Sequence, residues 1–531
     1  MEEVLSPISQ WLHRDVSLTL GSSIVALFIC VVVLYHRLVP ATDARDPPLI
    51  PYRIPWLGSA LSFSNDFTNF MQWVRRVMPS ETPYRIYMGG RTLYLITSPR
   101  LYAKFVRNAK TMSFDLLERD IFDKIFAMRK NDLDKFCVGM HGFPVPEGMT
   151  KEQAEERAMA PTFMKQYTEN WFGQTQGLEE ASNRFADNWN KALDDIIGTA
   201  ETAEITTRKL TEHHVFWAAS SVHFGTHLKE IVPNGAELLW QFEEGFLKLF
   251  QETPPWLLKG PIRARDELTA AIEKWTLQGL EKAPNLSDDV LWDEWWGGRV
   301  LRQRDTLTSS NGLSVNGRAI HNVALLWALN ANAIPTVAWG IIYILRNPDL
   351  IPRLRAETET AIILSPELKI DLQALTKLPL FHSIYQESLR LTIANMAARI
   401  VTEDTDLEGY NLKKGRLVVA PSYALHLSPV FDNPGHPATE FWAERFMVEG
   451  PEKSKLLNSW RPFAGGTHYC PGRYLAASEF FVTIGLLILK FDMTLEERDG
   501  RIEHMTGRYG TGAVRPDRPG YISLKRREER S

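Results

Sequence analysis

The chain has little cysteine and little net charge for its size, and both shortages narrow what it can be. Its 531 residues include three cysteines, Cys30, Cys137 and Cys470. Three cysteines this far apart in the chain are too few for a disulfide framework. We therefore expect the folded part of the protein to lie in a reducing compartment. The formal net charge of −4 gives no indication of a nucleic-acid partner. The sequence also lacks zinc-ligand spacings, phosphate-binding loops, internal repeats and low-complexity tracts.

Apolar residues, in contrast, are plentiful. Hydrophobic residues make up 44% of the chain and aromatic residues 11%, which is typical of a large globular core. Length alone predicts about three domains. From Ser98-Pro99, which reads as a helix cap followed by proline at the first position, to Arg318 the pattern is mostly helical. A β-rich stretch follows Leu391. We expect the tryptophans of the helical part to pack in the core: Trp240, Trp256, Trp275, Trp292, Trp295 and Trp296.

The segment Leu18–Val39 is apolar and long enough to cross a bilayer of about 30 Å as a helix. The charges flanking it mildly favour a cytosolic body, because Arg37, Arg45 and Arg53 follow it. The alternative is a cleaved signal peptide, which the long run and the missing small-residue cleavage site disfavour. Four prolines then predict a stiff linker: Pro47, Pro48, Pro51 and Pro55. Next, Gly89-Gly90 between Tyr84–Met88 and Thr92–Thr97 predicts a β-hairpin.

The stretch Phe463–Arg473 places Cys470 in a glycine-rich loop before an apolar segment, Tyr474–Leu489, that reads as a helix. A helix N-terminus lowers the pKa of a cysteine and favours the thiolate, a ligand for iron. We expect Pro471 in the first turn of that helix. Taken alone, Cys470 could equally be a buried cysteine that packs as a small hydrophobe.

The whole stretch resembles the haem-binding loop of the cytochromes P450, Phe-x-x-Gly-x-(Arg/His)-x-Cys-x-Gly, at every position. The resemblance implies haem b as the cofactor, with Cys470 as the axial thiolate ligand of its iron. It also implies that Phe463 packs near the sulfur and that His468 reaches a haem propionate. Arg399, at the start of the first strand after a predicted helix, resembles the propionate-binding arginine of the family. Its alternative is a plain surface arginine.

Glu387 and Arg390 lie three residues apart in a segment, Pro379–Leu391, that reads as a helix. Such a pair can bond on one helix face, although it is usually a solvated surface pair. It resembles the Glu-x-x-Arg motif of the cytochromes P450, whose third member would here be Arg445. We expect a buried structural triad behind the haem, because a buried carboxylate needs such partners.

The resemblance replaces the three-domain estimate. It implies a mainly α fold with a smaller β-rich part, the cytochrome P450 fold, preceded by one N-terminal transmembrane helix. We expect residues 1–45 to be a membrane anchor and linker and residues 46–531 to be the haem domain. A single-pass protein of the endoplasmic reticulum, with its catalytic domain in the cytosol, is the predicted arrangement.

The central helix expected at Ile320–Leu345 departs from the family, because Ile334 and Pro335 stand where most members carry an acid–Thr pair. Pro335 cannot donate to the carbonyl of Ala331. That carbonyl, the Asn332 amide and the Thr336 hydroxyl could hold waters beside iron and give another proton path. They could instead cap the helix without a catalytic role. The pattern resembles the branch of the sterol 7α-hydroxylases and prostacyclin synthase.

The function that this resemblance implies is oxygen insertion into a lipophilic substrate such as a terpenoid, sterol or other secondary metabolite. Electrons would come from NADPH-cytochrome P450 reductase. Two alternatives stay open: an isomerase or dehydratase that needs no external electrons, and a non-catalytic haem- or lipid-binding protein. By resemblance, the expected pocket walls are Phe114, Ala331, Ala394–Ala397 and Tyr509–Val514.

Overall fold

The structure is a computed structural model. It describes residues 43–527 except 53, 55, 66, 79, 80, 365, 366, 506, 507 and 509, together with Val25, Phe28 and Cys30. The predicted transmembrane helix, Leu18–Val39, therefore lies outside the described residues apart from those three positions. Within the described part, one helical stretch, Val315–Leu345, is long and apolar enough to cross a membrane, but 83% of its most apolar window is buried. It is therefore a core helix of the body.

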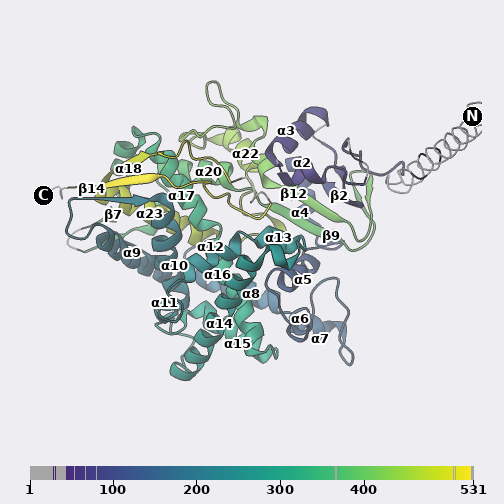
Figure 1. The fold of residues 1–531 in the computed structure, drawn as a ribbon, viewed down its shortest axis with the longest axis horizontal. Coiled ribbons are helices and arrows are strands. Elements are labelled where there is room, and N and C mark those ends of the chain that lie inside the picture. Colours follow the sequence, from purple (N-terminus) through teal and green to yellow (C-terminus); the bar gives the residue numbers. More distant parts are fainter. Residues whose placement is uncertain are drawn as a thin grey trace, which may run out of the picture.

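Helices dominate the fold, and the strands gather in a smaller part (Figure 1). In the first half of the chain the α-helices are α2 Ala60–Asn65, α3 Phe67–Val77, α4 Pro99–Arg107, α5 Asp115–Lys124, α6 Lys130–Phe136, α7 Lys151–Arg157, α8 Met159–Trp171, α9 Gln176–Ile197, α10 Phe216–Phe224, α11 His227–Ile231, α12 Gly235–Glu243 and α13 Phe246–Phe250. The later ones are α14 Lys259–Lys282, α15 Arg299–Ser310, α16 Val315–Asn330, α17 Ala333–Leu345, α18 Leu350–Thr358, α19 Leu372–Leu375, α20 Pro379–Thr392, α21 Ser422–His426, α22 Gly450–Ser459 and α23 Arg473–Lys490. Short π- and 3₁₀-helices are η1 Lys209–Val215, η2 Pro255–Leu257, η3 Pro429–Phe431 and η4 Gly466–His468.

The largest sheet has five strands in the order β1-β2-β12-β9-β3. The strands are β1 Tyr84–Met88, β2 Arg91–Leu95, β3 Met112–Ser113, β4 Thr202–Thr206, β5 Trp292–Asp293, β6 Gly297–Gly298, β7 Ile362–Ile363, β8 Lys369–Ile370, β9 Met396–Val401, β10 Thr405–Leu407, β11 Tyr410–Leu412, β12 Leu417–Pro421, β13 Phe491–Glu496 and β14 Tyr521–Arg526. Strand β12 pairs parallel to β2 and antiparallel to β9. A second sheet, β13-β14-β4, joins the last strand to one formed some 300 residues earlier. The β-rich part thus draws on both ends of the chain.

The predicted hairpin is confirmed, because β1 and β2 pair antiparallel around Gly89 and Gly90, which both have positive φ. The predicted cap is also confirmed, because α4 begins at Pro99 and the Ser98 hydroxyl accepts a hydrogen bond from the N–H of Leu101 at 3.5 Å. Glycine-rich turn chemistry and a capping serine are local signals, so both elements can be read from short windows.

Three of the six tryptophans that we expected in the core are buried there, and Trp292 and Trp295 are half-buried. Trp240, Trp275 and Trp296 are buried, and the indole N–H of Trp275 donates to the carbonyl of Phe224 at 2.8 Å. Trp256 contradicts the packing prediction, since it is 68% exposed in the short helix η2. It lies in a short 3₁₀ helix between α13 and α14, beside the surface of α14. The indole ring of Trp256 is therefore an exposed apolar group on the protein surface.

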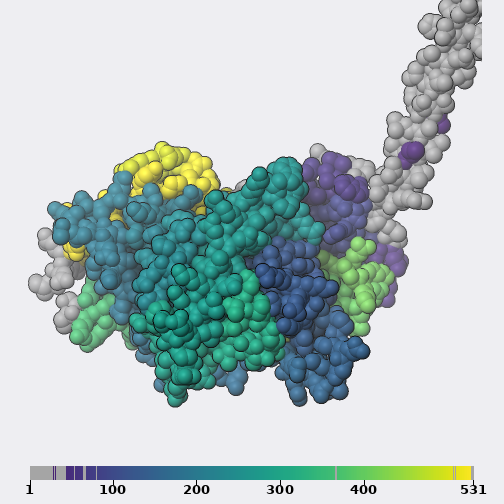
Figure 2. All heavy atoms as spheres, turned by 60° about the horizontal axis from the view of Figure 1, so that its bottom comes forward, coloured from purple at the N-terminus to yellow at the C-terminus, as the bar shows by residue number. Residues whose placement is uncertain are grey.

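Figure 2 shows that residues from the middle of the chain, coloured teal, cover much of one face, with early (purple) and late (yellow) segments at its upper edge. Beneath them, the largest hydrophobic cluster contains side chains from Phe122 to Leu524 and includes α9, α16, α17, α20 and α23. Helix α23, which follows Cys470, is nearly all buried. The cysteine loop is therefore attached to one of the core helices of the molecule.

Candidate functional site

The loop around Cys470 has a backbone that only small residues can adopt. Gly466 has φ of 68°, and a Cβ at that position would lie 2.0 Å from the carbonyl oxygen of Val106. Ala464 also has positive φ, at 56°, which is uncommon for a residue other than glycine. The N–H of Cys470 donates to the carbonyl of Phe463 at 3.1 Å. These contacts close the loop against helix α4.

Helix α23 begins at Arg473, with Gly472 as its N-cap residue. Pro471 therefore precedes the helix and does not occupy its first turn, contrary to our expectation. Phe463, half-buried, packs edge-to-face on Trp460 with ring centroids 6.1 Å apart. The predicted neighbour of the sulfur is thus part of a small aromatic contact that supports the loop.

Burial raises the pKa of the Cys470 thiol, although the N–H of Gly472 and the charge of Arg473 act to lower it. We expected the helix N-terminus to lower the pKa of this thiol, and that expectation is wrong. Desolvation by burial raises the pKa more than the Gly472 N–H and the Arg473 charge lower it. A metal ion reverses this balance, since a coordinating thiol is deprotonated. The Cys470 side chain keeps some accessible surface.

A cluster around the buried guanidinium of Arg399 lies beside the loop. Arg399 and His468 approach each other, with Nη2 of the arginine 3.2 Å from Nδ1 of the imidazole. The ring of Phe114 lies 4.9 Å from that of His468 and 5.4 Å from the guanidinium carbon of Arg399. Arg399 is buried, so it is not a plain surface arginine, and it lies within β9, not at its start. The sequence did not point to Asp115, whose Oδ1 is 3.6 Å from His468.

The predicted triad of Glu387, Arg390 and Arg445 is confirmed. The Nε of Arg390 donates to Glu387 at 2.7 Å, and the Nε of Arg445 donates to the same carboxylate at 2.9 Å. The three side chains are 0–2% exposed, so the surface-pair alternative is wrong. Remaining guanidinium protons reach backbone carbonyls, among them that of His426. A buried carboxylate with two such partners has its charge and its lone pairs satisfied.

The central helix, expected as one segment over Ile320–Leu345, is interrupted, and its second part begins two residues before Pro335. Helix α16 ends at Asn330 and α17 begins at Ala333. The carbonyl of Ala331 accepts from Nη1 of Arg508 at 3.2 Å, so a side chain occupies the acceptor that we assigned to water. Nothing in the sequence near Pro335 could have identified Arg508, which lies 177 residues after Ala331.

Asn332 and Thr336 also have partners within the protein. The Oδ1 of Asn332 accepts from the N–H of Ala513 at 2.9 Å, and the Thr336 hydroxyl donates to the carbonyl of Asn332 at 2.8 Å. Thr336 is buried, whereas Asn332 is half-buried. The Nδ2 of Asn332 makes no hydrogen bond within the part of the chain that the structure describes. Because Oδ1 of Asn332 already accepts a hydrogen bond, the two N–H groups on Nδ2 are the part of this side chain that can bind another molecule.

The face of α16 that continues into Asn332 keeps accessible surface. Ala324 is half-buried and Ala328 is exposed, although Leu325 and Leu326 between them are buried. Ala324 and Ala328 share one stripe of α16, and Asn332 follows in the break after that helix. Two alanines and an amide therefore make a shallow, mostly apolar strip along this helix.

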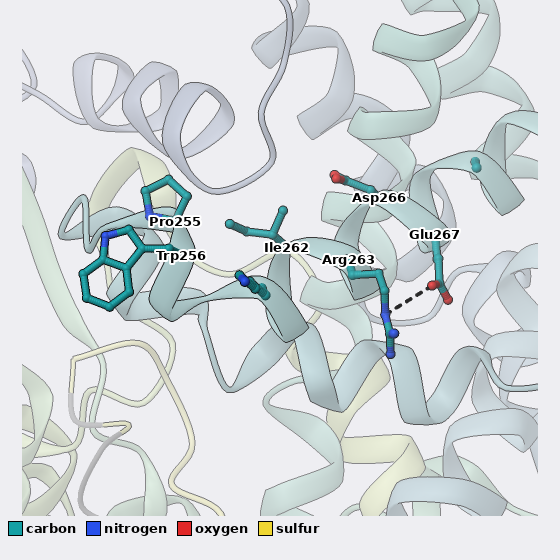
Figure 3. Close-up of a pocket in the computed structure, with 8 residues that line it drawn as sticks. Pro255, Trp256, Ile262, Arg263, Asp266 and Glu267 are labelled. Atoms are coloured by element: carbon teal, nitrogen blue, oxygen red, sulfur yellow. Dashed lines mark ion pairs between the residues drawn. The ribbon is translucent and has the colours of Figure 1, made fainter.

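Some of the residues that we expected to line the substrate pocket contact one another, but not all of them face a cavity. The N–H of Ala394 donates to Gly512 at 2.8 Å, and Ala513 contacts Asn332 as described. However, Ala331, Ala394 and Ala513 have no accessible surface, so they form a supporting layer. Tyr509 lies outside the described residues. A surface hollow of about 710 Å³ elsewhere is lined by Trp256 and its neighbours on α14 and contains none of the predicted site residues (Figure 3).

Residues 320–524 match the family model described as Cytochrome P450. This span includes the central helix, the triad, Arg399 and Cys470, which the structure arranges as described above. The protein is a cytochrome P450. It is therefore an oxidoreductase, and its cofactor is haem with a cysteine thiolate as axial ligand.

Relatives of this P450 agree with the assignment over most of its length. It is 28% identical to the cytochrome P450 monooxygenase efuG of Hormonema carpetanum over 99% of each chain. It is 25% identical to cytochrome P450 7B1 of Mus musculus over 86% of each chain. It is also 25% identical to cholesterol 7-alpha-monooxygenase of Cricetulus griseus, over 88% of this chain and 90% of the relative. The resemblance to the sterol 7α-hydroxylase branch is thus confirmed.

The donors present fit haem. Cys470 supplies the soft sulfur that iron accepts, and it keeps accessible surface at the end of a core helix. Arg399 supplies a cationic donor, and His468 an imidazole ring, for carboxylates of the kind that haem propionates carry. Within the described part of the chain no other group of three or more His, Cys, Asp and Glu side chains could hold a metal ion.

Proposed function

We propose that this P450 inserts oxygen into, or otherwise oxidises, a bulky lipophilic substrate such as a terpenoid, sterol or other secondary metabolite. The observation that carries the proposal is the strained loop that holds Cys470 at the start of α23 beside the Arg399–His468 pair. Support also comes from relatives whose names denote monooxygenases, one of them acting on cholesterol.

Haem with a thiolate ligand supplies dioxygen cleavage and oxygen transfer to carbon when it is bound. The protein holds and orients it. Cys470 is the iron ligand, its position set by the Phe463 carbonyl. Arg399 and His468 are the proposed partners of the propionates, with Phe114 packed against both. The Glu387 triad fixes the core behind the loop and touches no reacting atom.

Asn332 is the proposed catalytic side chain of the central helix. Its Oδ1 accepts from Ala513, which leaves its Nδ2 donors free for another partner. Those donors can order a water or a substrate hydroxyl. Thr336, predicted to share this task, instead donates its proton to the Asn332 carbonyl. We therefore assign Thr336 a positioning role that keeps the helix break in place.

The substrate class follows from the strip beside Asn332. Ala324 and Ala328 leave room and offer no polar group, so a flat or bulky apolar molecule suits the strip. Electrons come, in this proposal, from NADPH-cytochrome P450 reductase as a separate protein.

We assign residues 1–45 to a single-pass anchor and linker and residues 46–531 to the haem domain. The proposed location is the endoplasmic reticulum, with the haem domain in the cytosol. The apolar segment Leu18–Val39 supports this assignment by length and composition. Trp256 and Leu257, 68% and 58% exposed, supply further apolar surface for a membrane.

One observation favours a second candidate, an isomerase or dehydratase. The acid–Thr pair is missing, and the Ala331 carbonyl and Thr336 hydroxyl both have protein partners. An enzyme that rearranges an oxygenated substrate needs no external electrons and no proton relay.

The test compares metabolite masses in membranes with and without the protein, supplied with reductase, NADPH and candidate terpenoid or sterol substrates. A product heavier by one oxygen atom, dependent on NADPH, supports the proposal. A product lighter by two hydrogens indicates desaturation by the same chemistry. A product of unchanged mass, formed without NADPH, contradicts oxygen insertion and supports the isomerase.

A further inference from the structure

Three aromatic rings enclose Arg473, the first residue of α23. Its guanidinium carbon lies 4.3 Å from the ring centroid of Phe172 and 4.5 Å from those of Tyr469 and Tyr474. The negative ring faces attract the cation, and stacking removes rotamer freedom that an exposed arginine otherwise keeps. The rings come from both sides of Cys470 and from the end of α8. Arg473 is therefore held in one place next to the cysteine loop.

The guanidinium of Arg473 also makes a hydrogen bond to the backbone of Cys470, the residue that we propose as the iron ligand. Its Nη1 donates to the carbonyl of Cys470 at 2.9 Å. Within the described part of the chain, no carboxylate lies within ion-pair distance of Arg473. Its charge is thus balanced by no acidic neighbour there, and Arg473 itself is half-buried against the three rings. A charge in such surroundings acts over a longer distance than one in open solvent.

We propose that Arg473 is a positioning residue that sets the reduction potential of the bound haem: it holds the Cys470 peptide and keeps one uncompensated positive charge beside the sulfur. A positive charge there opposes electron release from the thiolate toward iron and so favours the reduced state. The proposal rests on the haem-thiolate function given above.

A mere clamp on the loop would use the same contacts, so the variants must separate charge from shape. Arg473→Gln removes the charge and keeps a donor for the Cys470 carbonyl. Arg473→Lys keeps the charge but loses the planar stacking. Phe172→Leu opens the cage while it leaves both the charge and the hydrogen bond in place.

The chain offers a matched control in Arg498. Its guanidinium also lies over a ring, 4.4 Å from the centroid of Tyr521, but two carboxylates, Glu204 and Glu496, pair with it. Arg498→Gln removes the same charge and a similar stacking contact away from Cys470. It therefore reports what loss of a stacked surface arginine does by itself.

The measurement is an anaerobic equilibrium titration of each full-length holoprotein in detergent against a reference dye. Its Soret spectrum with carbon monoxide is recorded in parallel. We expect Arg473→Gln to keep a thiolate-type spectrum and to reduce about tenfold less favourably, a fall of about 59 mV for one electron. Arg473→Lys restores most of the loss, and Arg498→Gln matches the wild type. Equal potentials for Arg473→Gln and Arg498→Gln overturn the proposal, as does an Arg473→Lys variant no better than Arg473→Gln.

If the Arg473→Gln variant does not retain haem, the reduction potential of the Phe172→Leu variant tests the proposal instead. Water that enters the opened cage weakens the field of the charge, so a smaller fall in potential is expected, and no fall overturns the proposal. The wild type separates the two levels of inference. Absence of a thiolate-type spectrum in the wild type refutes the haem-thiolate function, whereas a normal spectrum with an unchanged potential in the variants refutes only the role of Arg473.

Discussion

Single side chains at the break in the central helix are more firmly held than their sequence spacing indicated. Asn332 uses its oxygen on the Ala513 backbone and Thr336 uses its proton on the Asn332 backbone. The two residues looked equivalent as candidates for holding water. The structure makes them different, because one retains free donors and the other does not.

Substitution of these two residues should therefore have unequal effects. Asn332→Leu removes the free donors, and we expect turnover to fall roughly 10²-fold with more NADPH electrons lost as hydrogen peroxide. Thr336→Val removes one hydrogen bond worth about 1 kcal/mol and should change coupling little. The ratio of product formed to NADPH consumed checks both. Equal coupling in the two variants would contradict the assignment of Asn332.

His426 gives a pH dependence of stability. Burial and the nearby charge of Arg390 lower its pKa to about 3, and its Nε2 accepts from the N–H of Arg461 at 2.8 Å. In the unfolded chain a histidine titrates near pH 6.5. Below that pH the unfolded state binds a proton at this histidine and the folded state does not. The free energy of unfolding therefore falls as the pH drops toward the pKa of His426 in the folded protein.

The expected loss is up to about 1.4 kcal/mol per pH unit from this one group. His426→Gln keeps an acceptor for Arg461 without titrating, so its stability should fall less steeply between about pH 6 and pH 4. The apparent melting temperature of the holoprotein, followed across that range, measures the difference. Parallel pH profiles for wild type and variant would exclude His426 as a contributor.

Helix α20 is tied to the later part of the chain through Glu387, so its loss should act on a whole element. Glu387→Ala leaves two buried guanidinium groups without their carboxylate, at a cost of about 3–5 kcal/mol. We expect haem incorporation to be lost, as measured by bound haem per protein. Glu444→Gln is the control, because its partner Arg353 is exposed and such pairs contribute at most about 1 kcal/mol. Normal haem content in Glu387→Ala would refute the structural role.

The C-terminal loop positions the central helix through Gly512. A Cβ there would lie 1.8 Å from Oδ1 of Asn332, so Gly512→Ala must displace that amide. We expect the same increase in peroxide as in Asn332→Leu, without any change to the amide itself. At Gly298 the nearest atom to an added Cβ is 3.9 Å away, so Gly298→Ala serves as the control. Unaltered coupling in Gly512→Ala would show that the contact does not govern oxygen use.

Elements with local signals could be read from the sequence, and long-range contacts could not. The cysteine loop, the hairpin, the α4 cap and the Glu387 triad each depend on short spacings or on a family pattern. Arg508 reaching Ala331 and Asp115 reaching His468 join residues far apart in the chain. No periodicity marks such partners, because the fold alone brings them together. Trp256 was misassigned for the same reason, since composition does not tell which tryptophan stays exposed.

For the molecule as a whole, the membrane assignment makes a separate prediction. Removal of residues 1–45 should release the protein from the carbonate-resistant membrane fraction. Substitution of Trp256 and Leu257 by serine should then weaken the remaining peripheral binding to vesicles, because two exposed apolar side chains are lost. Cosedimentation with vesicles measures both steps, with Leu277→Ser on the exposed face of α14 as the control. Full retention of the truncated chain in the carbonate pellet would contradict a single N-terminal anchor.

The pairing of β14 with β4 and of Arg508 with Ala331 bears on when the protein can mature. Arg508 is synthesised 177 residues after Ala331, and β14 is synthesised long after β4. Until then the break in the central helix lacks the side chain that occupies its carbonyl, and β4 lacks its partner strand. Haem capture is therefore expected to wait for these late segments, and until they are made the nascent chain stays in an incomplete state that depends on chaperones.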